Sequence, residues 1–252
     1  MSDRNIGCLL SGGLDSSLVT SVACHLMKKR GKKLRTYSIG MKEGTDIIYA
    51  REVAQHIGSD HTEFIYEAEE GLAAIKDVVK VTETFDITTI RASCGQYLLA
   101  KRISTLTDTI VVLNGDGADE CQMGYLYFYL APSAEEARKD RDRLVQEIHL
   151  YDGLRVDRNI SHFGLEARVP FLDHRFVDLY YQIDPKLLIP TADRMEKYLI
   201  RRAFEVVWPD VLPDSVLWRK KEAFSDGVSS KEKSWYQMVK QHVHTVLYPE
   251  LL

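Results

Sequence analysis

Apolar positions along the first half of the chain form short continuous runs, separated by longer stretches in which apolar residues recur at helical spacing. A short apolar run bounded by turn residues is typical of a buried strand, and spacings of three and four are typical of an amphipathic helix. Apolar runs predict strands at residues 6–10 and 109–115, and the segments at 34–40 and 61–66 are further strand candidates. The spacing predicts helices near residues 14–27, 46–58, 68–83 and 89–104. Such alternation predicts a parallel sheet with right-handed crossovers, the doubly wound α/β class.

The pattern changes beyond about residue 130, where no further run resembles a buried strand. Helical spacing predicts helices there near residues 134–157, 173–183 and 194–207, and prolines punctuate them. We therefore expect residues 1–252 to form a single domain. An α/β part over 1–130 would carry a helical cap over 131–252, packed on the edge of the sheet.

Composition narrows the class of protein. Apolar residues make up 45% of the 252 residues, enough for a substantial core, and the net charge of −4 is spread without long runs of one sign. That balance argues against nucleic acid or an acidic membrane as a partner. No apolar stretch approaches the ~20 residues of a membrane helix, and the N-terminus lacks the order of a secretion signal. We expect a soluble, cytoplasmic protein whose four separated cysteines are reduced core thiols, not a disulfide framework or a zinc site.

The stretch LLSGGLDSS, residues 9–17, lies between the first predicted strand and helix. Gly12 and Gly13 allow a tight turn and a close approach to a ligand, and the helix start offers free N–H groups to an anion. Asp15 would repel a bare phosphate, so it implies a magnesium ion bound jointly with that phosphate. Alternatively, Asp15 only favours the helix N-terminus, by about 0.3–1 kcal/mol, and the loop is a simple turn. The residues of this stretch leave both readings open.

Other nucleotide and hydrolase motifs are absent from the sequence. It contains no GxxxxGK[ST], no GxGxxG after a strand and no GxSxG elbow. SGGLDSS after a first strand instead resembles the pyrophosphate-binding loop of ATP pyrophosphatases. These enzymes split ATP into AMP and pyrophosphate while they activate a carboxyl or carbonyl group.

Four later blocks narrow the resemblance. They are ETFDITTIRAS (83–93), GDGADE (115–120) with the following Tyr125, GLEARVPFLD (164–173) and KEAFSDG (221–227). In this order they resemble the synthetase domain of glutamine-dependent asparagine synthetase, over roughly residues 5–240. The resemblance implies a Rossmann-like, five-stranded parallel sheet flanked by helices. It also implies an AMP-forming carbon–nitrogen ligase that uses ATP and Mg²⁺.

The resemblance assigns roles residue by residue. The positions matched to the pyrophosphate and magnesium loop are Ser11, Gly12, Gly13, Asp15 and Ser16. Those matched to the AMP and ATP site are Leu9, Ile39, Gly40, Asn114 and Gly115. Those matched to groups that form the activated intermediate are Thr88, Thr89 and Arg91. Asp119 is matched to metal and substrate binding, and Lys221 to the pyrophosphate side of the transition state. Arg168 has two readings, binding a carboxylate or forming a buried ion pair.

The implied reaction converts L-aspartate to L-asparagine through β-aspartyl-AMP, from which ammonia displaces AMP. The family's proposed proton acceptor is a glutamate, and Asp116 takes its position here. Aspartate is one methylene shorter, and misplacement by about 1 Å can cost ~10²-fold in rate. We expect Asp116 to retain the function; the alternatives are that it binds metal or caps the next helix.

A second departure lies at the N-terminus, where family enzymes carry a glutaminase domain that begins with a cysteine. This chain begins with Met1 and Ser2 and enters the first strand at once. We expect no glutaminase domain here, with ammonia used free or supplied by another domain or subunit, unless the chain is a fragment of a longer protein. A homodimer is compatible with the resemblance. Two other functions stay open: an AMP-forming amide synthetase with another substrate, and a nucleotide-binding regulatory protein on a weakened scaffold.

Overall fold

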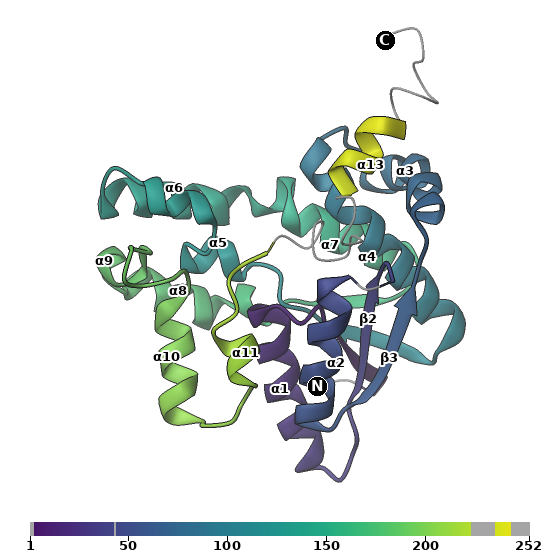
Figure 1. Cartoon of the computed structure of the whole chain (residues 1–252), viewed down its shortest axis with the longest axis horizontal. Helices are drawn as coiled ribbons and strands as arrows, with labels where there is room; N and C mark the ends of the chain where they lie inside the picture. Colours follow the sequence, from purple (N-terminus) through teal and green to yellow (C-terminus); the bar gives the residue numbers. More distant parts are fainter. Residues whose placement is uncertain (1–2, 43, 223–234, 243–252) are drawn as a thin grey trace, which may run out of the picture.

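The computed structural model describes residues 3–42, 44–222 and 235–242 (Figure 1). Its centre is a five-stranded sheet in the order β3-β2-β1-β4-β5, and every paired strand is parallel to its neighbour. The strands are β1 (Asn5–Leu9), β2 (Arg35–Gly40), β3 (Asp60–Ile65), β4 (Thr109–Leu113) and β5 (Glu166–Arg168). The predicted α/β class and the five-stranded parallel sheet are confirmed.

Helices cover both faces of the sheet, and each face has its own apolar core. The helices of the first half are α1 (Leu14–Lys28), α2 (Thr45–Ile57), α3 (Ala68–Thr82), α4 (Ile87–Leu106) and the short α5 (Ala118–Gln122). One core joins α1 and α2 to the sheet, and the other joins α3 and α4 to its opposite face. Figure 1 shows α1 and α2 on one side of β2 and β3, with α4 on the other.

The second half adds further helices, some of which pack on these two cores, while others form a third apolar cluster around Met123, Phe128, Ala137, Tyr180 and Leu188. They are η1 (Leu126–Leu130), α6 (Ala134–Glu147), η2 (Ile148–Leu150), α7 (Asp152–Ser161), η3 (Pro170–Leu172), α8 (His174–Gln182), α9 (Pro185–Leu188), α10 (Tyr198–Val207), α11 (Asp214–Leu217) and α13 (Trp235–His242). Val156 and Ile160 of α7 join the α3–α4 core, whereas Ile200 of α10 and Val216 of α11 join the α1–α2 core. The division at residue 130 into an α/β part and a cap stays a prediction.

Two predictions for this half are wrong. A strand does follow residue 130: β5 pairs with β4, but its three residues, EAR, include two charged side chains and none of the three is fully buried, so they carry no apolar run. The helix expected over 134–157 is broken between α6 and α7, where Tyr151 has φ −128° and ψ −95°. A Cβ on Gly153 would lie 2.8 Å from the Ile148 carbonyl oxygen, so glycine permits this close turn.

The cysteine prediction is confirmed, because all four thiols are free and buried. Burial raises the pKa of Cys8, Cys94 and Cys121 to about 12, which leaves them protonated at neutral pH. None of the helices within residues 3–42, 44–222 and 235–242 combines the length and apolarity that crossing a membrane requires.

Candidate active site

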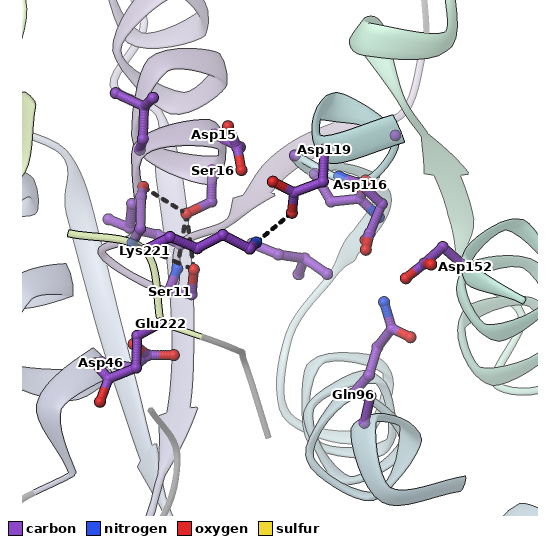
Figure 2. A pocket seen from close by; sticks show the side chains of 18 of the residues that line it. Ser11, Asp15, Ser16, Asp46, Gln96, Asp116, Asp119, Asp152, Lys221 and Glu222 are labelled. Carbon is purple, nitrogen blue, oxygen red and sulfur yellow. Dashed lines mark hydrogen bonds and ion pairs between the residues drawn. The ribbon is translucent and has the colours of Figure 1, made fainter. Parts of the chain in front are cut away.

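A cavity of about 320 Å³ opens at the carboxyl ends of β1, β2 and β4 (Figure 2). In an open α/β sheet this edge is where ligands bind, because the loops that leave the strands meet there. The β1–α1 loop and the β4–α5 loop form adjacent walls of the cavity, and the start of α4 forms another. Lys221 reaches into it from a segment more than a hundred residues further along the chain.

Two glycines determine how the loops at the cavity pack. Gly12 has φ +74°, and a Cβ there would lie 2.5 Å from the backbone nitrogen of Ala50, so only glycine fits. A Cβ on Gly115 would lie 2.5 Å from the backbone nitrogen of Ser16. The loops after β1 and β4 therefore touch backbone to backbone, which holds the start of α1 against the end of β4.

Serine hydroxyls organise the β1–α1 loop internally. The Ser11 and Ser16 hydroxyl oxygens lie 2.9 Å apart, and the Ser11 N–H donates to the Ser16 hydroxyl over 3.2 Å. The Ser16 hydroxyl also donates to the Gly13 carbonyl over 3.3 Å. These bonds place hydroxyl groups and the first turn of α1 at the cavity wall, an arrangement that suits a bound anion.

A buried lysine joins the two carboxylates that the sequence marks for metal binding. The Lys197 ammonium lies 2.5 Å from Asp15 Oδ2 and 2.6 Å from Asp119 Oδ1, and its side chain is only 3% exposed. Lys221 Nζ lies 2.5 Å from the other oxygen of Asp119 (Figure 2). Burial alone would lower the pKa of Lys197, but the two carboxylates outweigh burial and raise it.

The neighbouring ammonium groups lower the pKa of Asp119. Burial by itself raises the pKa of this carboxyl, but Lys197 and Lys221 together hold it well below its usual range. Asp119 is therefore ionised at neutral pH. The centre of the cavity contains two carboxylates and two ammonium groups in direct contact.

A second charged group lies on the α7 side of the cavity. Arg155 Nη2 lies 2.7 Å from Asp116 Oδ1, and the same nitrogen contacts Asp152. Burial raises the pKa of Asp116, and the Arg155 guanidinium opposes that rise. The Tyr125 hydroxyl donates to Glu120, whose pKa burial and the nearby carboxylates raise to about 8.

Comparison with known proteins places this chain in a family. The family model described as asparagine synthase matches residues 1–147 and 140–250. The chain belongs to the asparagine synthase family. It is 50% identical over 245 residues to the asparagine synthetase [glutamine-hydrolyzing] of Gallus gallus, and 47% identical to that of Homo sapiens. Either alignment covers 96% of this chain and 43% of the relative, so the chain spans less than half of the relatives' length.

Similarity to solved structures is weaker. An NAD⁺ synthetase from Burkholderia pseudomallei aligns with a TM-score of 0.31 and 14% identity, over 71% of this chain and 78% of that chain. An NMN synthetase from Francisella tularensis aligns with a TM-score of 0.34 and 17% identity, over 87% and 88% of the two chains. The fold described above does not depend on these similarities.

Most positions matched to asparagine synthase family roles line the one cavity. They are Leu9, Ser11, Gly13, Asp15, Ser16, Ile39, Thr88, Arg91, Asn114, Gly115, Asp116, Asp119 and Lys221. Gly12 and Gly40 are buried beside it in the backbone of the β1–α1 loop and the end of β2. Of the KEAFSDG block, residues 223–227 lie outside the described residues.

Thr89 and Arg168 do not line the cavity. Thr89 is buried in the first turn of α4, where its N–H donates to the capping carboxylate of Asp86 over 2.7 Å. The Arg168 guanidinium lies 2.6 Å from Glu166, and both side chains are partly exposed on edge strand β5. The buried ion pair considered for Arg168 is therefore wrong, because the pair is formed at the surface.

The structure also decides one alternative for Asp116. Gly117 is the N-cap of α5, no side chain among the described residues caps that helix, and the Asp116 carboxylate contacts Arg155. The helix-capping alternative is therefore wrong.

The sequence patterns do not single out Lys197, because the helix expected over 194–207 would bury it among ordinary helical positions. In the structure it precedes α10 in a left-handed conformation, with φ +57°.

The donor set at Asp15 and Asp119 fits a magnesium ion bound together with phosphate. Asp15 Oδ1 is buried and has no hydrogen-bond partner among the described residues. Within those residues no three acidic, histidine or cysteine side chains form a group that could hold a metal. Mg²⁺ is commonly bound by one or two carboxylates plus substrate phosphates, which agrees with two carboxylates beside an anion-binding loop.

Proposed function

We propose that this chain is an AMP-forming ligase that converts L-aspartate, ATP and ammonia into L-asparagine, AMP and pyrophosphate. The observation that carries the proposal is the convergence of the β1–α1 loop, Lys221 and Asp119 on one cavity at the carboxyl edge of the sheet. Membership of the asparagine synthase family supports the same chemistry. The cavity combines groups suited to a polyanionic leaving group with groups suited to proton transfer.

The first half-reaction forms an acyl-adenylate. An oxygen of the aspartate side-chain carboxylate attacks the α-phosphorus of ATP, and the bond from that phosphorus to the β-bridging oxygen breaks. Pyrophosphate leaves with the bonding electrons, and Lys221 and the loop of Ser11–Ser16 are placed to stabilise its charge. A magnesium ion held by Asp15 and Asp119 would supply further positive charge to the phosphates. Thr88 and Arg91, on the α4 wall, are candidates to position the aspartate.

The second half-reaction forms the amide. The ammonia nitrogen attacks the acyl carbon of β-aspartyl-AMP, the bond from that carbon to the AMP oxygen breaks, and a proton leaves the nitrogen. Asp116 is the proposed proton acceptor, since burial raises its pKa and so makes its carboxylate a better base. Arg155 fixes one Asp116 oxygen at 2.7 Å and leaves the other available.

The source of ammonia belongs to this proposal as well. The relatives are named glutamine-hydrolyzing, so ammonia reaches this site either free or from a glutaminase domain or subunit. Assembly as a homodimer and a cytoplasmic location are further predictions. The ammonia source is tested directly by comparing ammonium with glutamine as nitrogen donor for the isolated chain.

An isotope experiment tests the reaction. The protein is incubated with ATP, MgCl₂, ammonium and aspartate that carries ¹⁸O in its side-chain carboxylate. The proposal predicts equal amounts of AMP, pyrophosphate and asparagine, with one ¹⁸O in the phosphate of AMP. The variant Asp119→Asn, purified identically, controls for contaminating enzymes and should form no product above background.

Other outcomes identify other functions. ADP with ¹⁸O in inorganic phosphate would show an acyl-phosphate route and refute the proposal. AMP released with a different carboxylate, but not with aspartate, would identify a related amide synthetase. Tight ATP binding with no exchange of labelled pyrophosphate into ATP would identify a nucleotide-binding regulatory protein.

A further inference from the structure

Lys197 occupies the space between the two carboxylates that are candidates for metal binding. Its ammonium contacts Asp15 Oδ2 from one loop and Asp119 Oδ1 from another, at 2.5 and 2.6 Å. Figure 2 shows Asp15 and Asp119 turned toward each other from the start of α1 and from α5. A fixed positive charge therefore lies where a divalent cation shared by these two residues would also lie.

The surroundings are built to hold this side chain. Lys197 has φ +57°, a conformation that residues with a Cβ rarely adopt, and it directly precedes α10. A Cβ on Gly124 would lie 2.6 Å from Lys197 Cε, so the absence of a side chain at position 124 makes room for the lysine. The N–H of Arg201, one turn into α10, donates to the Lys197 carbonyl over 3.2 Å.

We propose that Lys197 is a resident counter-cation that keeps free divalent metal ions off Asp15 and Asp119 until a metal-bound polyphosphate enters the cavity. This inference rests on the proposed function in taking a polyphosphate as the ligand. A free divalent ion at Asp15 would lie beside an ammonium whose side chain is only 3% exposed, so solvent would screen the repulsion between the two cations poorly.

A polyphosphate removes that repulsion. Lys197 would donate hydrogen bonds to the polyphosphate oxygens, so the ammonium and the metal ion would each gain an anionic partner. Asp15 Oδ1, which is buried and has no partner in the described parts of the chain, can then bind metal while Lys197 keeps Oδ2. Lys197 thus favours the metal–polyphosphate complex over the metal alone, and it acts as a positioning residue.

The test measures metal binding without turnover. Mn²⁺, which electron paramagnetic resonance detects when free, is titrated into nucleotide-free protein and again in the presence of pyrophosphate. Lys197→Met keeps the length of the side chain and removes its charge. We expect the variant to bind free Mn²⁺ on the order of tenfold or more tightly than wild type, and Mn²⁺–pyrophosphate at least about tenfold more weakly. The double variant Lys197→Met/Asp15→Asn should lose the gain for free Mn²⁺.

Two further variants serve as controls for this test. Lys139→Met removes an exposed lysine of α6, which is paired with Glu136 at 2.7 Å, and should change neither affinity. Lys197→Arg keeps the charge, so its affinity for free Mn²⁺ should stay near that of wild type. This variant can be measured even if the methionine variant does not fold. The proposal is overturned if Lys197→Met and wild type bind free Mn²⁺ equally, or if only thermal stability changes. Because no ATP or aspartate is used, a failed synthesis assay would leave this result readable on its own.

Discussion

The contact between Gly115 and the start of α1 offers a direct test of how the cavity is built. In Gly115→Ala the new Cβ would lie 2.5 Å from the Ser16 nitrogen and 2.7 Å from the Asp15 carbonyl carbon, whereas ordinary contacts begin at 3.4 Å. Both neighbours are backbone atoms, so the two loops must separate by about 1 Å. Overpacking of this kind costs about 1–3 kcal/mol of the free energy of unfolding.

The larger effect should appear in catalysis. A displacement of about 1 Å between catalytic groups can cost ~10²-fold in rate. We expect Gly115→Ala to lower aspartate-dependent exchange of labelled pyrophosphate into ATP by roughly this factor, while urea unfolding reports the smaller loss of stability. Measurements at saturating ATP and aspartate separate a misplaced group from weaker binding.

Gly13→Ala is the matched control in the neighbouring loop. Its Cβ would meet nothing nearer than Ser11 Oγ at 3.5 Å, and the backbone has φ −75°. Replacing the N-cap glycine by alanine should lower the free energy of unfolding by on the order of 1 kcal/mol at most. The alanine also restricts the unfolded chain, which should raise the free energy of unfolding by about 0.4–1 kcal/mol. The two effects nearly cancel, so stability should barely change. Exchange should nevertheless fall by about tenfold if phosphate approaches this backbone closely. If Gly115→Ala keeps both wild-type stability and exchange within about twofold, the rigid packing of the two loops is refuted.

Three further predictions concern charged residues of the cavity. Lys221→Met should lower pyrophosphate exchange by about 10²–10³-fold with little loss of stability, measured by exchange and urea unfolding, because it removes a charge directed at the leaving group. Asp116→Asn should leave that exchange largely intact but lower asparagine formation by about 10²-fold or more, measured by product analysis. Glu120 is protonated more readily when folded, with a pKa near 8 against 4.5 for an ordinary glutamate, so the folded state keeps a proton that the unfolded chain releases. The free energy of unfolding should therefore fall as pH rises from about 5 to 8, and Glu120→Gln should flatten that fall in urea titrations; equal pH slopes would contradict this.

The apolar pattern is sufficient to predict four of the five strands and the helices between them. Strand β2 and the edge strand β3 include several polar residues, but the inner strands β1 and β4 have runs of apolar residues, because parallel strands covered on both faces are largely apolar. The exception, β5, is a three-residue edge strand whose sequence carries no such run. The break between α6 and α7 is similarly hidden, since it depends on a turn at Tyr151 within a continuous helical pattern.

The residues of the cavity could also be predicted from the sequence only in part. The loop at Ser11–Ser16 and the Asp116–Asp119 block are predictable, because each places its residues beside the end of a strand within a few positions. Lys197 is not, since its role comes from two carboxylates that lie 182 and 78 positions earlier in the chain.

The ion pairs of the cavity wall bear on which ligand the cavity can accept. Lys197, Lys221 and Arg155 are all paired with carboxylates of the cavity wall, so the site is close to electrically compensated before any ligand enters. A polyanion alone would have to break those pairs, and a metal ion alone would have to approach buried cations. A metal–polyphosphate complex carries positive and negative charge together. Its metal ion can bind the carboxylates while its phosphates accept hydrogen bonds from the lysine and arginine side chains. We therefore expect the cavity to bind the complex in preference to either component, because Lys197 lies between two aspartates.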